Sequence, residues 1–270
     1  MPDNGQPAPL LEVSDLTVVY GGAPRPAVEG ADLVLERAGS LGLAGESGSG
    51  KSTLAHAVLG LLPATARRTG TVRFAGAELA SGSAAYRTLR WKRMSVVLQD
   101  AMNAFNPVVT MGEQIAEIWT THQRTGWREA LEKAQGLVQR VGLESSAVDR
   151  FPFELSGGMR QRAAIAMAVA LSPDLVVVDE PTSALDVLSA NTVVDVINAA
   201  REETGAAFLV ISHDISVIAR TCARACVLRE GRVVEEGETP KLLEAPEHEV
   251  TRRLILAIPR LPLAETGGAS

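Results

Sequence analysis

Hydrophobic and polar positions follow two different periods along the chain. Apolar residues at alternate positions predict a strand over 11–20, interrupted near Ser14 and Asp15. Short apolar runs are typical of strands buried on both faces of a parallel sheet, and they lie at 41–44, 94–98, 175–178 and 208–211. Apolar spacings of three and four residues predict helices at 51–62, 129–141, 159–171 and 187–203. The alternation of strands and helices predicts an α/β fold with a mainly parallel sheet flanked by helices.

Two segments depart from this alternation. From 101 to about 148 the pattern is mainly helical, which predicts a helical insertion within the larger fold. Near the C-terminus, the apolar pair at 227–228 and the segment 232–236 flank Gly231 and predict a late hairpin. Beyond this hairpin we expect a helical extension that ends in a tail rich in glycine, alanine and serine.

Composition narrows the functional classes. The 270 residues carry a net charge of −6, so no overall basic field favours nucleic acid. The first residues lack the basic and apolar pattern of a signal peptide, and no apolar run approaches the roughly 18 residues that span a bilayer. We therefore expect a chain that is not secreted and meets membranes only through partners. The spacing of Cys222 and Cys226 could put them one helical turn apart, but no nearby Cys or His completes a metal site, so we expect reduced thiols there rather than a metal or redox pair.

The clearest functional motif directly follows the apolar run 41–44. The segment has the spacing of a phosphate-binding P-loop, and its residues are Gly45, Glu46, Ser47, Gly48, Ser49, Gly50, Lys51 and Ser52. In such a loop, glycines allow backbone N–H groups to surround an anion, and the following helix adds its positive end. Lys51 would reach the β- and γ-phosphates, and Ser52 would offer its hydroxyl to Mg²⁺. The alternative is a glycine- and serine-rich turn that caps an ordinary helix.

Two further apolar runs also end in polar residues. Asp179 and Glu180 follow the run 175–178, and His213 follows 208–211. Ligands of open α/β sheets bind at the carboxyl ends of strands, so these residues and the P-loop would converge on one nucleotide. Asp179 would hold Mg²⁺, Glu180 would polarise the attacking water, and His213 would contact the γ-phosphate. The alternatives are an acidic cap at a strand end and a capping histidine.

A fourth motif makes a family resemblance specific. The segment 155–162, Leu-Ser-Gly-Gly-Met-Arg-Gln-Arg, resembles the signature sequence of ATP-binding cassette (ABC) ATPases. Ser156 would cap a helix whose N-terminus, opened by Gly157 and Gly158, can approach a phosphate. In that family the phosphate belongs to the ATP of the opposite protomer, so two cassettes enclose two ATP molecules. The order of P-loop, glutamine, signature, Asp-Glu strand end and histidine extends the resemblance from about Leu11 to Ile258.

The resemblance implies roles for further residues. Tyr20 resembles the aromatic residue that stacks on adenine, although a core aromatic is the alternative. Gln99 resembles the glutamine that meets Mg²⁺ and senses the transmembrane subunits, and it joins Glu180 and His213 in the expected catalytic set. Thr53 completes the nucleotide-binding segment. Asp186 ends the segment 183–186, which resembles the loop that communicates across the dimer.

The same resemblance implies a P-loop ABC ATPase fold with four parts. A loose N-terminus would cover 1–10, and the nucleotide-binding core, with an antiparallel β subdomain, would cover 11–98 and 166–237. A helical subdomain would cover 99–165, and a C-terminal extension and tail would cover 238–270.

Several segments resemble the ATPases of peptide and nickel importers, among them 45–50, 112–114, 158–162 and 251–254. Departures from that group's pattern stand at Leu98, Ala101 and the segment 248–250, which are packing and docking positions. Because no cysteine follows Cys226, we expect no iron–sulfur cluster of the kind that some relatives carry, and we expect ATP and Mg²⁺ as cofactors.

The resemblance implies the ATPase of a bacterial importer for peptides, nickel or a metal chelate, peripheral on the cytoplasmic side of the inner membrane. Its partners would be a second cassette (the same or a related chain), two transmembrane permease subunits and, indirectly, an extracytoplasmic substrate-binding protein. No nucleic acid partner is expected. The alternatives are a soluble ABC ATPase acting on nucleic acid or ribosomes, an exporter ATPase, and a binding module without hydrolysis, against which Glu180 and His213 argue.

Overall fold

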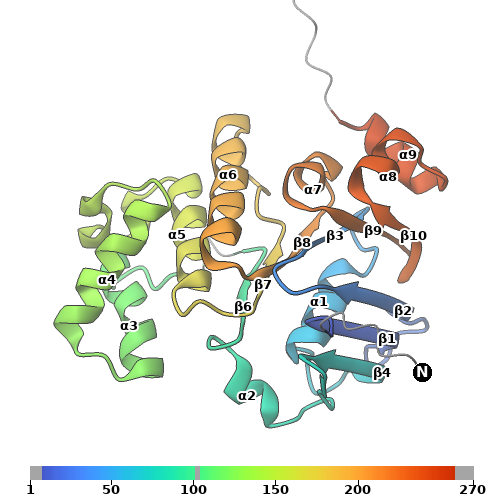
Figure 1. The fold of residues 1–270 in the computed structure, drawn as a ribbon, viewed down its shortest axis with the longest axis horizontal. Coiled ribbons are helices and arrows are strands. Elements are labelled where there is room, and N and C mark those ends of the chain that lie inside the picture. Colours follow the sequence, from blue (N-terminus) through green and yellow to red (C-terminus); the bar gives the residue numbers. More distant parts are fainter. Residues whose placement is uncertain (1–7, 101–103, 259–270) are drawn as a thin grey trace, which may run out of the picture.

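Two sheets carry the architecture of the computed structural model, which describes residues 8–100 and 104–258 (Figure 1). The antiparallel sheet has the order β2–β1–β4–β5, and its strands are β1 (Leu11–Val19), β2 (Val28–Leu35), β4 (Arg67–Phe74) and β5 (Ala77–Glu78). The larger sheet has the order β10–β9–β3–β8–β7–β6. Its strands are β3 (Ser40–Gly45), β6 (Met94–Val97), β7 (Leu175–Asp179), β8 (Ala207–Ser212), β9 (Arg224–Arg229) and β10 (Arg232–Glu238).

Parallel pairing joins β6, β7, β8, β3 and β9, and only β10 returns antiparallel, as the partner of β9. Every residue of β3, β7 and β8 is buried, as expected for strands covered on both faces. The expected α/β fold with a mainly parallel sheet is therefore confirmed.

The helices lie on both sides of this sheet, and they are α1 (Lys51–Leu59), α2 (Ala85–Leu89), α3 (Met111–Gln123), α4 (Trp127–Arg140), α5 (Gly157–Val169), α6 (Val187–Thr204), α7 (Ile215–Thr221), α8 (Thr239–Glu244) and α9 (Glu249–Leu256). In Figure 1, α3 and α4 lie at the far left and the antiparallel sheet lies at the lower right. No helix within 8–100 or 104–258 is both long and apolar enough to cross a bilayer.

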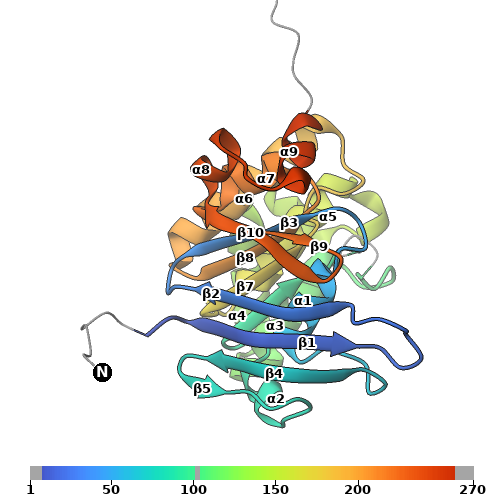
Figure 2. The ribbon, with the colours of Figure 1, turned by 90° about the vertical axis from the view of Figure 1, so that its right-hand side faces the viewer.

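Successive side chains of each buried strand supply two separate cores. Leu175 and Val177 of β7 pack with α1 and the antiparallel sheet, which lies below the larger sheet in Figure 2. Val176 and Val178 pack on the other face, in the core formed with α3 to α7. The large sheet is therefore held from both sides, and the loops at its strand ends are left to form a site.

The parallel pairing brings three chemically important strand ends to one edge. Ala44 pairs with Ser212, and Ile211 pairs with Asp179. The strand that leads to His213 thus lies between the strand that leads to the P-loop and the strand that ends at Asp179. The expected convergence of these segments follows from this order.

The structure differs from the predictions at several helices. Helix α1 ends at Leu59 rather than at residue 62, because Gly60 takes a left-handed conformation (φ 63°) and its N–H donates to Ala57 O at 3.3 Å. Helix α5 covers Gly157–Val169 rather than 159–171, and it begins directly after Ser156, the expected cap. Helix α7 has no predicted counterpart; Cys222 follows it while Cys226 lies on β9, so the two cysteines are not one helical turn apart.

Some predictions fall partly outside the described residues. Residues 1–7 of the expected loose N-terminus, Ala101, and residues 259–270 of the expected tail belong to this group.

Candidate functional site

The P-loop connects β3 to α1 and encloses the ammonium group of Lys51. This residue is only 5% exposed, and its Nζ donates to Gly45 O at 2.8 Å and to Glu46 O at 2.9 Å. Burial lowers the pKa of Lys51, while the nearby carboxylates of Glu180 and Asp179 oppose that shift. The loop therefore holds a desolvated cation by backbone carbonyls, which phosphate oxygens could replace.

Ser52 and Asp179 form an oxygen-rich pair at the first turn of α1. Ser52 Oγ donates to Asp179 Oδ1 at 3.2 Å, and Asp179 is only 3% exposed. Burial raises the pKa of Asp179 and outweighs this hydrogen bond. Gln99 is exposed two residues beyond the end of β6, the strand that pairs with β7. A carboxylate, a hydroxyl and an amide oxygen fit Mg²⁺, which favours oxygen ligands and takes one or two carboxylates beside phosphates and water.

Glu180 and His213 form a second pair, directly beyond Asp179. The Glu180 carboxylate accepts a hydrogen bond from His213 N at 3.1 Å, and its other oxygen lies 2.8 Å from His213 Nδ1. An ionised carboxylate only accepts, so the Nδ1 hydrogen lies between the two groups. Glu180 has φ +49°, a left-handed conformation that costs a non-glycine residue about 1 kcal/mol or more. The strand end thus holds this carboxylate in a fixed and strained position, as functional residues often are.

Tyr20 and Thr53 place the end of β1 beside the start of α1. The Tyr20 hydroxyl and Thr53 Oγ1 are 3.2 Å apart, and Tyr20 is half-buried. The structure therefore brings Tyr20 next to the P-loop helix, rather than into the interior as the core alternative would require.

Ser156, Gly158 and Asp186 form a separate cluster. Ser156 Oγ accepts from Met159 N at 3.3 Å and caps α5, with Gly157 as the first helical residue. The Asp186 carboxylate caps α6 and accepts from Ser189 N at 3.0 Å. A Cβ on Gly158 would lie 3.0 Å from the Ser189 side chain, so the two helix starts touch. In the part of the chain that the structure describes, the side-chain hydrogen bonds of Ser156 and Asp186 go to the first turns of α5 and α6.

Two residues near the C-terminus contact the P-loop without any sequence signal. Gly231 N donates to Ser49 O at 2.9 Å, and Arg253 lies 3.4 Å from the carboxylate of Glu46. Both partners are separated from the loop by about 180 residues or more, so no motif could join them. The contact between Glu180 and His213, which are 33 residues apart, was likewise not predicted, although each residue was expected in the site.

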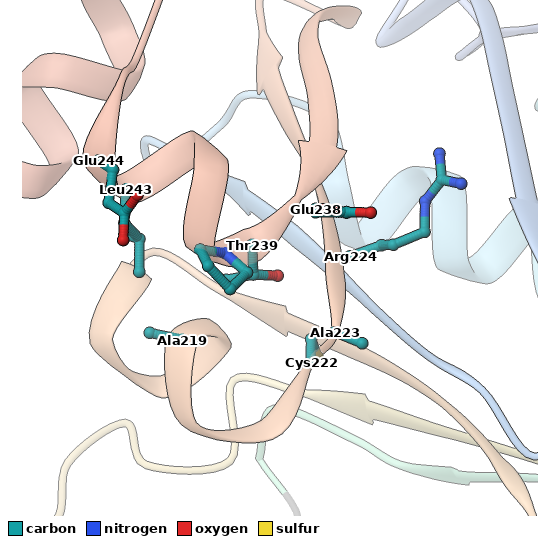
Figure 3. Close-up of a pocket in the computed structure, with 9 residues that line it drawn as sticks. Ala219, Cys222, Ala223, Arg224, Glu238, Thr239, Leu243 and Glu244 are labelled. Atoms are coloured by element: carbon teal, nitrogen blue, oxygen red, sulfur yellow. The ribbon is translucent and has the colours of Figure 1, made fainter.

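A cavity of about 640 Å³ lies away from these residues, between α7, β9 and α8 (Figure 3). Its lining consists of Ala219, Cys222, Ala223, Arg224, Glu238, Thr239, Pro240, Leu243 and Glu244. Arg224 is paired with Glu236, and Glu238 is paired with Lys241. The cavity contains none of the expected site residues, and two of its charged groups are already neutralised, so the P-loop edge is the better candidate.

Comparisons with known proteins give the family and the fold of the chain. Residues 28–183 match the family described as ABC transporter. The oligopeptide transport ATP-binding protein OppD of Mycobacterium tuberculosis is 44% identical over 96% of this chain, and the chain spans 43% of that protein's length. A probable peptide ABC transporter ATP-binding protein, y4tR of Sinorhizobium fredii, is 39% identical over 93% of the chain and 77% of its own length.

Among solved structures, a dimeric post-hydrolysis state of the ATP-binding cassette MJ0796, bound to ADP and Pi, superposes with a TM-score of 0.75. It is 26% identical and covers 85% of this chain and 98% of that one.

Proposed function

Because the chain belongs to the ABC transporter family, as its motifs predicted, we propose that it is the ATP-binding and hydrolysing subunit of a bacterial peptide importer. The observation that carries this proposal is the convergence of Lys51, the Ser52–Asp179 pair and the Glu180–His213 pair at one edge of the sheet. A cation for phosphates, oxygen ligands for Mg²⁺ and an oriented carboxylate for water are the parts that phosphoryl transfer to water requires.

In the proposed reaction, Lys51 exchanges its backbone carbonyls for phosphate oxygens. Asp179 and Ser52 would hold Mg²⁺, which would supply positive charge to neutralise the phosphates. Glu180 accepts a proton from the attacking water, while His213 fixes the Glu180 carboxylate through its N–H and Nδ1. Tyr20 would stack on the adenine, and Gln99 would offer its amide oxygen to the metal.

We further propose that the Ser156–Gly158 segment serves the nucleotide of a second cassette, which is another copy of this chain or a related one. Within the described residues, the side-chain hydrogen bonds of Ser156 and Asp186 go only to the first turns of α5 and α6, and this supports the arrangement. The helical part at 99–165 would transmit closure of the two cassettes to two permease subunits at the cytoplasmic face of the membrane. The names of the two relatives favour peptides over nickel or a metal chelate as cargo.

The proposal is tested by purifying the tagged chain from detergent-extracted membranes of its native host and identifying what accompanies it. We expect two hydrophobic permease subunits, and we expect the complex in vesicles to hydrolyse ATP faster when a peptide-loaded binding protein is added. Ribosomal proteins or DNA without permease subunits would contradict the transport function. Efflux of the substrate would contradict import.

A further inference from the structure

We propose that Gly231, in the turn between β9 and β10, holds the P-loop in its phosphate-binding conformation and thereby directs the Gly50 N–H toward the nucleotide. This inference rests on the proposed ATP site. Gly231 acts through the loop, so it is a positioning residue and not a catalytic one.

The turn is bonded on two sides. Gly231 N donates to Ser49 O at 2.9 Å, and Gly231 O accepts from Glu29 N at 2.8 Å. An ion pair between Arg232 and Glu29 adds a second link between the turn and β2. The turn therefore connects the P-loop to the antiparallel sheet, which is itself anchored by its own core.

Three backbone segments meet here with no room for side chains. Gly231 has φ +83°, and a Cβ on it would lie 3.0 Å from Ala27 O and 3.2 Å from Val28 Cα. Gly50 has φ +105°, and a Cβ on it would lie 2.4 Å from the same Ala27 O and 3.4 Å from Gly231 Cα. Gly50 of the P-loop and Gly231 of the turn thus pack against the same carbonyl group of a third segment. A side chain added at either glycine would therefore disturb the packing of the other.

The hydrogen bond from Gly231 N to Ser49 O also fixes the orientation of the Gly50 N–H. Ser49 O and the N–H of Gly50 belong to the same peptide group, which is planar and, when trans, directs its C=O and N–H in opposite directions. Holding Ser49 O on the turn therefore directs the Gly50 N–H away from the turn. Gly50 is the residue that precedes α1, so this N–H stands beside the unpaired N–H groups of the helix start, where a phosphate binds.

Gly231→Ala tests the inference, and Gly76→Ala is a matched control. Gly76 occupies the turn between β4 and β5 with φ +80°, and a Cβ there would meet nothing within 4 Å. Both substitutions add the same left-handed strain, but only Gly231→Ala pushes against Ala27 and loosens the bond to Ser49. We expect Gly231→Ala to weaken Mg-ATP and Mg-ADP binding by about 3- to 10-fold, the scale of one hydrogen bond. The Gly76→Ala affinities should equal those of the wild type.

Equilibrium binding and thermal unfolding are measured together, with Lys51→Ala as the reference for a lost site. A purely structural role of Gly231 would lower the unfolding midpoint and leave both affinities unchanged, which would overturn the inference. If Gly231→Ala does not fold, Gly231→Asn and Gly76→Asn replace the pair, because asparagine tolerates the left-handed region. A wild type that binds no Mg-ATP would overturn the proposed function itself, whereas wild-type binding with unchanged Gly231 variants would overturn only this inference.

Discussion

Replacing Glu180 by glutamine removes one charge and preserves the shape of the side chain. The glutamine oxygen can still accept from His213 N, and its NH₂ group can donate to His213 Nδ1 when the ring hydrogen moves to Nε2. Both contacts of the carboxylate therefore have a replacement. We expect the variant to fold and to bind Mg-ATP with an affinity close to that of the wild type.

The rate of ATP hydrolysis by Glu180→Gln, in contrast to its affinity for Mg-ATP, should fall strongly. A positioned general base contributes about 10²- to 10⁴-fold in rate, which is about 3–5 kcal/mol of activation free energy. The Glu180 side chain is only 9% exposed, so bulk water cannot easily replace it as the proton acceptor. Hydrolysis by Glu180→Gln should fall by about this factor of 10² to 10⁴.

The assay is single-turnover release of phosphate from γ-labelled ATP, run beside equilibrium binding of the same nucleotide. Glu78→Gln, on the exposed strand β5, is the control for loss of a carboxylate elsewhere and should hydrolyse ATP at the wild-type rate. Hydrolysis by Glu180→Gln at a rate near that of the wild type would refute the role of Glu180 as the base.

Two further predictions follow from burial. Burial raises the pKa of Asp179 in the folded protein. As pH rises from the ordinary aspartate range through that raised pKa, the carboxyl ionises in a buried place and the folded protein loses stability. A neutral side chain at this position would not have this cost. Without Mg²⁺ and nucleotide at pH 7.5, Asp179→Asn should therefore unfold at a higher temperature than the wild type, yet hydrolyse ATP poorly; a lower midpoint would contradict this. Burial also raises the pKa of Cys222 and of Cys226 to about 12, so neither thiol should react with iodoacetamide at pH 8 until the protein is unfolded, as mass spectrometry would detect. Rapid alkylation of either cysteine in the native protein would show that the thiols are not enclosed as described.

Much of the site could be predicted because its functional residues directly follow apolar runs in the sequence. Short apolar runs are expected as strands of a parallel sheet that is covered on both faces, and this applies to 41–44, 175–178 and 208–211. Parallel strands bring their carboxyl ends to one edge of the sheet. The residues after each run therefore had to lie near one another. The resemblance added the roles of Ser156 and Gln99, which periodicity alone does not give.

The rest depended on tertiary contacts. Helix α7 has seven residues and is capped by Asp214, and a segment this short carries too few turns for periodicity to separate it from a loop. Pro63 predicts that the helix ends at residue 62, whereas Gly60 ends α1 where the Tyr86 ring leaves no space for a Cβ. Gly231 was predicted as a hairpin turn, but only the fold shows that this turn contacts the P-loop.

In the proposed arrangement, ATP bound at Lys51 joins two cassettes, each of which supplies half of the other's site. The most direct test is the native mass of Glu180→Gln by light scattering, measured alone and with any cassette chain that co-purifies, with and without Mg-ATP. We predict pairing only when Mg-ATP is present, and we predict that adding Ser156→Arg abolishes the pairing while each chain still binds ATP. Pairing without nucleotide would contradict this arrangement. So would the absence of pairing at saturating Mg-ATP both for the chain alone and for the chain with a co-purifying cassette.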